Sequence, residues 1–280
     1  MNQVAIVGGG ELGGLLAHAL ARRHVASDIR LIDDNGSAAA GKALDISQAA
    51  PVEGFAARLS AAADVSAAAG AAIVAIADPF GAQPWQAEPA MLLLKRLRDV
   101  APAALIVCTG ASHRELVERG VRELHMSKAL LFGSAPEALA GGIRALTSIE
   151  ANGSPSDISL SVLGVPPHHI VVAWEEATVG GFALTRILGE PARRRLESRV
   201  AALWPPGPYA LASAAAKVID SIVGRSRRLV TCFVAPDDAA GTRARAVALP
   251  VRLGPSGVVD VRVPEMSVRE RVRLENAMLL

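Results

Sequence analysis

The sequence predicts an α/β protein, with a doubly wound parallel sheet followed by a smaller α+β domain. Three observations lead to this fold class. Short runs rich in β-branched residues alternate with longer helical patterns through the first half of the 280 residues. A glycine-rich turn joins the first of these runs to the first helical pattern, and the alternation ends near residue 135. Strands that alternate with helices require right-handed crossovers, which produce a parallel sheet.

The elements of the first half follow from the spacing of their apolar residues. The β-branched runs are predicted as strands at 3–7, 29–33, 72–76 and 104–109, and a short apolar run adds a fifth at 129–132. Apolar residues recur at helical spacing between or after these strands, over 11–24, 36–50, 87–100 and 113–124. These elements assign residues 1–135 to one doubly wound domain.

The second half of the chain has a different order of elements. A long helical pattern at 137–153 leads to a strand-like run at 158–163. A hairpin-like pair follows at 228–235 and 243–252, and a charged helical pattern closes the chain at 267–279. Helices and antiparallel strands in this order are typical of an α+β domain. We therefore expect a second domain over residues 136–280.

Composition excludes several functional classes. The formal net charge is +2 and charged residues make up 20% of the chain, so neither a nucleic-acid binder nor a binder of acidic surfaces is indicated. No apolar run reaches the roughly 18 residues that cross a bilayer. No basic segment precedes the first strand, which argues against a signal peptide. We expect a cytoplasmic protein that does not bind membranes.

The two cysteines lie in apolar, strand-like runs, at Cys108 and Cys232. Two thiols in a chain of this length provide neither a disulfide framework nor the spacing of a metal site. Buried, structural cysteines are the preferred interpretation, and we expect no metal.

The most informative motif is a G-x-G-x-x-G pattern that follows the first strand and opens the first helix. Its glycines are Gly8, Gly10 and Gly13, with Glu11 and Leu12 in the first helical turn. Gly8 allows the tight turn, Gly10 leaves room for a pyrophosphate and Gly13 lets helix and strand pack closely. Free N–H groups at the helix N-terminus then favour phosphate. The motif predicts a Rossmann-type dinucleotide site, although glycines can also serve a tight βα turn alone.

An acidic residue in the expected place strengthens this prediction. Asp33 ends the second strand, 20 residues after Gly13, where a carboxylate accepts hydrogen bonds from a ribose diol. Asp34 follows it, and two acids at this place repel a 2′-phosphate, which favours NAD over NADP. The alternative interpretation is that Asp33 caps a loop.

Several segments resemble the NAD-dependent malate/lactate dehydrogenase family. The run Gly-Lys-Ala-Leu-Asp-Ile-Ser-Gln-Ala-Ala-Pro-Val-Glu-Gly at 41–54 is similar to the third helix of bacterial malate dehydrogenases. Residues 248–254, with Gly257 and Val258, resemble the final hairpin of that family, and 29–33 and 162–164 also fit their places. Because the similarity runs in order along the chain, it implies a nucleotide-binding domain followed by a substrate domain.

The resemblance also implies that the family's catalytic residues are missing. In that family a histidine transfers a proton, an aspartate orients the histidine and an arginine binds the substrate carboxylate. Alignment places Pro166 at the position of the histidine, Leu139 at that of the aspartate and Gly142 at that of the arginine. The asparagine of a Thr-Asn-Pro turn becomes Gly110.

Two further segments of the family's active site also differ. The mobile loop, which carries arginines in the family, corresponds to 79–89 and contains none here. The segment around 204–207 is shorter than its counterpart and lacks the serine or threonine that faces the substrate.

Some polar residues near these places are weak candidates for a replacement. His168 and His169 lie two and three residues past the histidine's place, although solvent-facing loop histidines are the simpler interpretation. We expect His113 to be a surface residue at a helix N-terminus and Glu137 to be a helix cap or first-turn acid. The remaining charged groups are expected to begin a helix or to form solvated faces: Glu175 and Glu176, Arg193 to Arg195, and Arg225, Arg227 and Arg228.

Two hypotheses for function follow. The first is a non-catalytic or regulatory NAD-binding protein that retains the dehydrogenase scaffold for binding, assembly or an unknown protein partner or small ligand. The second is an active NAD-dependent oxidoreductase that acts on a non-standard substrate through displaced catalytic groups. The helix at 41–48 resembles one that pairs subunits in relatives, so we expect a homodimer or a dimer of dimers.

Overall fold

The computed structural model describes residues 3–224, 228–235 and 245–279. Its first half contains six parallel strands in the order β3-β2-β1-β4-β5-β6, which confirms the doubly wound sheet. The strands are β1 (Gln3–Val7), β2 (Asp28–Ile32), β3 (Arg58–Ala62), β4 (Ile73–Ile76), β5 (Leu105–Cys108) and β6 (Leu131–Gly133). The strand order reverses between β1 and β4, which is where ligands bind in sheets of this kind.

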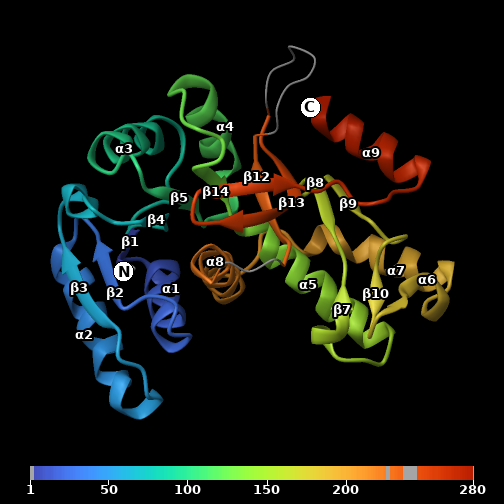
Figure 1. Ribbon diagram of the computed structural model, residues 1–280, viewed down its shortest axis with the longest axis horizontal. Coiled ribbons are helices and arrows are strands. Elements are labelled where there is room, and N and C mark those ends of the chain that lie inside the picture. The colour runs from blue at the N-terminus through green and yellow to red at the C-terminus, as the bar shows by residue number, and fades with distance from the viewer. Residues whose placement is uncertain (1–2, 225–227, 236–244, 280) are drawn as a thin grey trace.

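Helices cover both faces of this sheet because its strands are apolar on both sides (Figure 1). In β1, Val4 and Ile6 belong to the core on one face, and Ala5 and Val7 belong to the core on the other. The helical segments of this half are α1 (Glu11–Arg22), α2 (Gly36–Glu53), η1 (Val65–Ala68), α3 (Ala87–Val100), η2 (Ala111–His113) and α4 (Arg114–Glu123). Residues of α1 and α2 enter the first core, whereas residues of α3 and α4 enter the second.

The second half mixes helices with mainly antiparallel strands, as the sequence predicts. Its helical segments are α5 (Ala135–Glu150), η3 (Pro155–Asp157), α6 (Leu184–Ile187), α7 (Glu190–Val200), η4 (Ala201–Leu203), α8 (Pro208–Val223) and α9 (Val268–Leu279). Its strands are β7 (Ile158–Ser159), β8 (Val162–Val165), β9 (His169–Val172), β10 (Thr178–Val179), β11 (Phe182–Ala183), β12 (Val230–Val234), β13 (Val247–Gly254) and β14 (Gly257–Val261). The predicted hairpin is the antiparallel pair β12 and β13.

One sheet continues through both halves. Strand β12 pairs with β6 through Phe233 and Gly133, and the order continues as β6-β12-β13-β8-β9. Strands β7, β10 and β11 form a separate small sheet. Helix α5 begins at Ala135, where the sequence places the domain boundary, but the sheet crosses that point. The division into two domains therefore stays a prediction.

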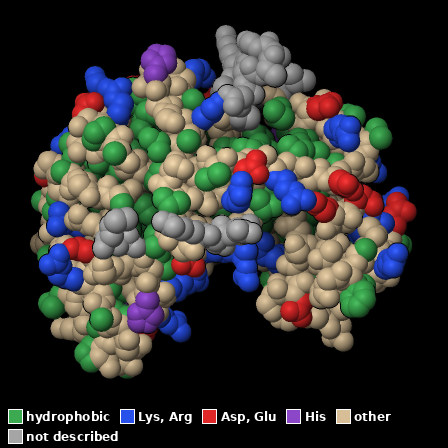
Figure 2. Space-filling model, in the orientation of Figure 1, with side chains coloured by type: hydrophobic (Ala, Val, Ile, Leu, Met, Phe, Trp, Pro, Cys, Tyr) green, Lys and Arg blue, Asp and Glu red, His purple; other side chains and the backbone are tan. Residues whose placement is uncertain are grey.

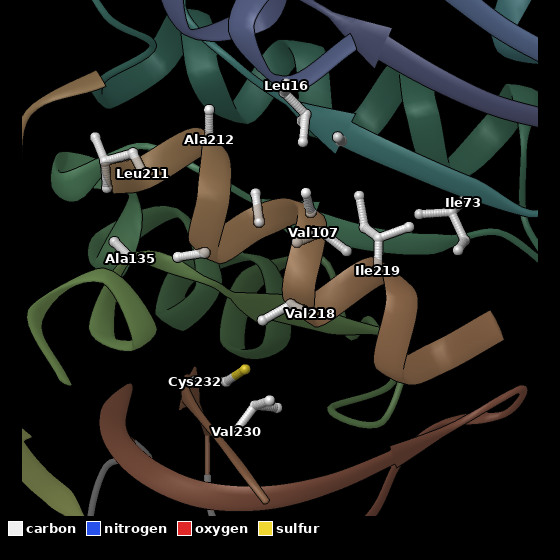
Figure 3. Close-up of a cluster of buried hydrophobic side chains, with 14 of the residues drawn as sticks. Leu16, Ile73, Val107, Ala135, Leu211, Ala212, Val218, Ile219, Val230 and Cys232 are labelled. Carbon is white, nitrogen blue, oxygen red and sulfur yellow. The ribbon is translucent and has the colours of Figure 1, made fainter. Parts of the chain in front are cut away.

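A single apolar core also joins the two halves. Helix α8 packs beside α1, and Figure 3 shows side chains of α8 clustered with Leu16, Ile73 and Val107. Leu16 of α1 and Ile219 of α8 are fully buried in this core, together with Val107 of β5 and Cys232 of β12. Both cysteines are free and buried, which confirms the interpretation drawn from the sequence, and burial raises the pKa of both thiols.

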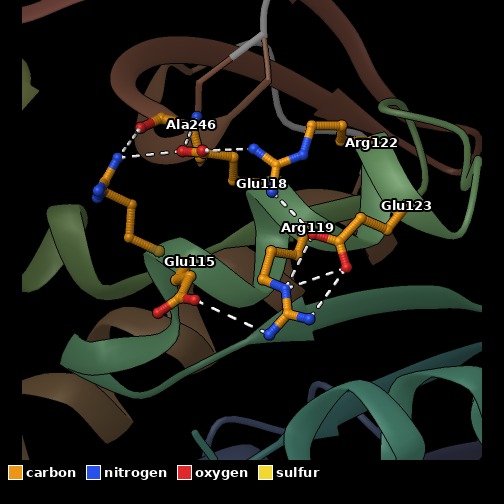
Figure 4. Close-up of polar contacts among 7 residues, drawn as sticks. Glu115, Glu118, Arg119, Arg122, Glu123 and Ala246 are labelled. Carbon is orange, nitrogen blue, oxygen red and sulfur yellow. Dashed lines mark hydrogen bonds and ion pairs between the residues drawn. The ribbon is translucent and has the colours of Figure 1, made fainter. Parts of the chain in front are cut away.

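A polar clamp on α4 holds the beginning of β13. Glu118 accepts a hydrogen bond from the Ala246 N–H at 3.2 Å, and Arg114 donates to the Ala246 carbonyl at 3.2 Å. Arg122 pairs with Glu118 at 3.3 Å, and Figure 4 shows these groups converging from one side of α4. Two side chains from the first half thus bind the N–H and the carbonyl of one residue in the second half.

The structure corrects several element predictions. The expected strand at 158–163 is divided between β7 and β8, and β3, α7 and α8 are elements that the spacing of apolar residues does not reveal. Glu175 and Glu176 lie in a turn and begin no helix. Arg225 and Arg227, with residues 243–244 of the expected hairpin, lie outside the described residues.

The surface of the molecule carries both acidic and basic side chains (Figure 2), as the small net charge of the sequence leads one to expect. On the face shown in Figure 2, acidic and basic side chains are interspersed, and the surface is hollowed between two lobes. Within residues 3–224, 228–235 and 245–279, no helix is long and apolar enough to cross a membrane.

Candidate functional site

The glycine motif forms a turn in which a Cβ would clash with backbone oxygens at all three glycines, Gly8, Gly10 and Gly13. Gly8 has φ +114°, and a Cβ at this residue would lie 2.3 Å from the Ala77 carbonyl oxygen. A Cβ at Gly13 would lie 1.9 Å from the Gly8 carbonyl oxygen. Both distances are far below a van der Waals contact, so the turn between β1 and α1 can form only with these glycines.

Gly10 lies against the end of the neighbouring strand β4. Its N–H donates to the Asp78 carbonyl at 2.9 Å, and a Cβ on Gly10 would lie 2.5 Å from that oxygen. The Gly10 N–H is therefore already hydrogen-bonded within the protein, whereas a phosphate site needs N–H groups that are free to bind the ligand. The donors that remain for a ligand are those of the first turn of α1, which have no carbonyl one turn earlier in the helix.

Asp33 is held by three backbone N–H groups. Its Oδ2 accepts from Gly9 at 2.7 Å and from Phe80 at 2.8 Å, and its Oδ1 accepts from Asn35 at 2.9 Å. The residue is 6% exposed. A carboxylate has about four acceptor sites, so Oδ1 keeps capacity for one more donor, such as a ribose hydroxyl. Asp33 thus ties the glycine turn to the segment after β4 and also borders solvent.

Two clefts flank this segment at the point where the strand order reverses. The smaller, of about 190 Å³, is lined by Asp33, Asp34 and Gly8, with apolar residues of α3. The larger, of about 540 Å³, is lined by Gly10, Glu11 and Leu12 and by Pro206, Pro208 and Leu211 around the start of α8. Pro79 lines both clefts. An extended ligand laid across the glycine turn would have one end in each.

Two charged side chains in the larger cleft were not among the sequence candidates. Lys42 of α2 donates to the Gly10 carbonyl at 2.9 Å, and its ammonium lies 5.9 Å from the centre of the Phe80 ring. Asp78, at the end of β4, has a buried Oδ1 without a hydrogen-bond partner among the described residues. Burial raises the pKa of this carboxyl. The position of Asp78 after a buried strand was a signal that could have identified it.

The three residues that the resemblance places at the family's catalytic positions are buried or lie against apolar side chains. Leu139 is fully buried and belongs to an apolar cluster with Val162 and Trp174. A Cβ on Gly142 would lie 3.3 Å from the Leu203 side chain, so that leucine occupies the space next to the helix. Pro166 is buried in the turn between β8 and β9. None of these three residues lines either cleft.

The histidine candidates lie away from the clefts. His168 and His169 are both exposed, in the turn before β9 and at its first residue, and neither lines either cleft. His113 corrects the expectation of a surface residue, because it is 1% exposed. Its Nδ1 accepts from the Gly110 N–H at 3.0 Å, and burial lowers the pKa of His113 to about 4. Gly110 makes room for the ring, since a Cβ there would lie 2.9 Å from it.

Glu137 lies in the first turn of α5, as expected, but it is buried and does not act as a surface cap. Its side chain is 2% exposed and pairs with Arg144 at 2.6 Å and with Lys217 of α8 at 2.7 Å. It also accepts from the Thr231 N–H of β12 at 2.8 Å. This carboxylate therefore links α5, α8 and β12. The sequence does not predict this role, because a single acidic residue gives no indication of its partners.

Arg193 to Arg195 lie on α7, where Arg194 and Arg195 are exposed, in agreement with a solvated face. Within the described residues there is no group of three or more histidine, cysteine, aspartate or glutamate side chains that could hold a metal ion.

Comparison with known proteins identifies relatives over nearly the whole chain. Residues 2–86 match the sequence model of the lactate/malate dehydrogenase NAD-binding domain. The chain is 25% identical, over 99% of its length and 96% of the relative's, to a malate dehydrogenase of Thioalkalivibrio sulfidiphilus.

Solved structures share the fold. A lactate dehydrogenase of Cryptosporidium parvum, determined with lactic acid and nicotinamide adenine dinucleotide, superposes with a TM-score of 0.88 at 19% identity, over 99% of this chain and 94% of that one. A malate dehydrogenase of Salinibacter ruber gives 0.87 at 20% identity, over 98% and 93%.

Proposed function

Because this chain belongs to the lactate/malate dehydrogenase family, we propose that it is an NAD-binding member that no longer carries out the family's reaction on 2-hydroxy acids. The observation on which this depends is the contrast between its two halves. The glycine turn joins β1 to α1, as a dinucleotide site requires, whereas the positions that the resemblance assigns to catalysis hold Pro166, Leu139 and Gly142. The scaffold then serves for binding, assembly or regulation.

Recognition of NAD is supported by the clefts on either side of the glycine turn. The smaller cleft presents Asp33 and Asp34 to an adenosine ribose, and the larger takes the nicotinamide half beside α8. Two acids beside the ribose disfavour a 2′-phosphate, because like charges repel at close range. The lactate dehydrogenase with the same fold, whose structure includes NAD, supports this assignment.

Loss of the reaction is supported by the residues that stand where proton transfer and carboxylate binding would occur. Proline has no proton to exchange at 166, and leucine at 139 cannot orient an imidazole. The larger cleft has proline and leucine on its far wall and no arginine among the described residues that line it. Removal of a proton-transfer group alone costs roughly 10²- to 10⁴-fold in rate, and loss of the carboxylate anchor adds an orientation penalty.

Two measurements on the purified protein test this proposal. Isothermal titration calorimetry with NADH should detect binding, with much weaker binding of NADPH. The absence of any NADH binding up to millimolar concentration would refute the cofactor assignment, and equal affinity for NADPH would refute the role of the two acids. Absorbance assays with saturating NADH should show no reduction of oxaloacetate or pyruvate. Turnover at about 1 per second or faster would refute the non-catalytic function.

A homodimer, or a dimer of dimers, is part of the proposal. Helix α2 buries Ala39, Ala43 and Ile46 against its own domain, and it leaves Leu44 61% exposed and Val52 87% exposed. These apolar side chains support an interface formed by this helix. Sedimentation at micromolar concentration should give at least a dimer, and a monomer would refute this assembly.

An alternative function is an active oxidoreductase that uses a displaced catalytic group on a non-standard substrate. The exposed histidines do not favour it, but Asp78 does, because its unpartnered carboxyl oxygen and raised pKa suit a proton-transfer group in the larger cleft. A screen of neutral alcohols with NAD tests this alternative. Activity that is abolished by Asp78→Asn would support it and displace the non-catalytic proposal.

A further inference from the structure

Lys42 extends from α2 to the beginning of α1, where the structure makes room for it. Its Nζ donates to the Gly10 carbonyl at 2.9 Å. A Cβ at Gly14 would lie 3.3 Å from the ammonium nitrogen and 3.2 Å from Cδ, so a larger residue at position 14 would push the lysine aside. The glycine therefore allows an ammonium group to lie directly against the first turn of α1.

This position is electrostatically unfavourable while the cleft holds no anion. The first turn of a helix carries the positive end of the helix dipole, and a cation placed there is destabilising. The Gly10 carbonyl and the Phe80 ring, 5.9 Å from Nζ, compensate only in part. A negatively charged ligand in the cleft would interact favourably with both the ammonium and the helix terminus.

The charges around the larger cleft indicate why a lysine is needed there. Glu11 and Asp78 line the same cleft and carry acidic groups. Lys42 is the one basic side chain among the described residues that line it. A dinucleotide brings two phosphate charges to this place, so its pyrophosphate would face only acidic side chains if Lys42 were absent.

We propose that Lys42 donates a hydrogen bond to the pyrophosphate of the bound dinucleotide. An ammonium has three donors, so Lys42 can keep its bond to the Gly10 carbonyl while another N–H reaches a phosphate oxygen. The assignment deepens the proposed NAD site and depends on it. The proposed contact adds a side-chain cation to a site that otherwise binds phosphate through backbone N–H groups. It also explains why position 14 is a glycine, because a larger residue there would displace Lys42 from the ligand.

The experiment compares Lys42→Met and Lys42→Arg with the unmodified protein. Calorimetry with NADH and ADP-ribose, which both contain the pyrophosphate, and competition by adenosine, which lacks it, distinguish a phosphate contact from a general loss of structure. Lys42→Met should weaken NADH and ADP-ribose by about 10- to 100-fold, the range for a hydrogen bond to a charged group. Adenosine should bind as before, and Lys42→Arg should keep most of the affinity. Lys95→Met, which removes an exposed lysine of α3, should change nothing.

Each other outcome has a distinct meaning. Equal NADH affinity of Lys42→Met and the unmodified protein would overturn the assignment and leave the NAD site intact. An equal loss for adenosine would overturn it by assigning Lys42 a structural role. An unmodified protein that binds neither NADH nor ADP-ribose would refute the proposed function and, with it, this contact.

Discussion

Replacement of Glu137 by alanine is expected to destabilise the protein more than any change of a surface acid. The carboxylate, 2% exposed, receives hydrogen bonds from the Thr231 N–H and from the side chains of Arg144 and Lys217. Glu137→Ala leaves the backbone N–H of β12 without its acceptor and leaves the two cations without their shared counter-charge. The same change opens a cavity between α5, α8 and β12.

The magnitude follows from the exposure of the partners. Breaking a buried ion pair by removing one member costs about 3–5 kcal/mol when the remaining charge cannot reach water. Lys217 is 42% exposed and Arg144 is 20% exposed, so both cations rehydrate and the cost falls to the lower end, about 3 kcal/mol. Glu137→Gln keeps an acceptor for the Thr231 N–H and should cost about 1–2 kcal/mol.

Urea unfolding and differential scanning calorimetry measure this difference. For a chain of this size, about 3 kcal/mol corresponds to a decrease in Tm of roughly 6–10 °C. The control is Glu275→Ala, an exposed acid on α9, which should change Tm by less than about 1 °C. A Glu137→Ala protein with the Tm of the unmodified chain would show that the buried carboxylate does not hold the three elements together.

The remaining predictions concern the glycine turn, the larger cleft and the α4 clamp. Gly13→Ala should destabilise by at least about 3 kcal/mol and abolish NADH binding, because its Cβ would lie 1.9 Å from the Gly8 carbonyl, whereas Gly41→Ala, with no atom within 4 Å, should not. NADH affinity should rise as the pH falls through the raised pKa of Asp78, because protonation removes a negative charge beside the pyrophosphate. The Asp78→Asn protein should bind NADH more tightly at pH 7 and lose this pH dependence. If its affinity has the same pH profile as that of the unmodified protein, Asp78 does not cause the effect. Glu118→Ala should cost about 1–2 kcal/mol and speed hydrogen exchange at the Ala246 N–H, and unchanged exchange would mean that Glu118 does not hold that strand.

The sequence predicts the first half of the fold well because its signals are local. Strands β1, β4 and β5 are almost entirely apolar, and the glycine turn after β1 has a spacing that few other structures share. Strand β3 was missed because its residues are only partly buried and its sequence, Arg58–Ala62, is dominated by small and polar residues. Helix α8 was missed because alanine and serine occupy much of its length, and its burial depends on contact with α1.

The sequence predicts a site residue only where its spacing in the sequence identifies it, and it does not predict contacts that depend on how the elements pack. Asp33 can be predicted from its spacing in the sequence to the glycines, but one of its three backbone donors, the Phe80 N–H, lies 47 residues away in the sequence. Lys42 was part of a motif interpreted for subunit pairing, and its contact with Gly10 depends on how α2 lies beside α1. The burial of His113 depends on the glycine at 110, which the sequence shows only as a missing asparagine.

The core shared by α1, α8 and β12 determines how the chain can fold while the ribosome is still making it. Strand β6 is complete at Gly133, but its neighbour β12 begins about 100 residues later, at Val230. At about 5–20 residues per second, the edge of the sheet and the apolar face of α1 remain uncovered for roughly 5–20 s. Nascent chains in this interval expose the unpaired edge of β6, the kind of surface to which chaperones and other chains bind. A fragment that ends at residue 135 would keep that surface exposed permanently.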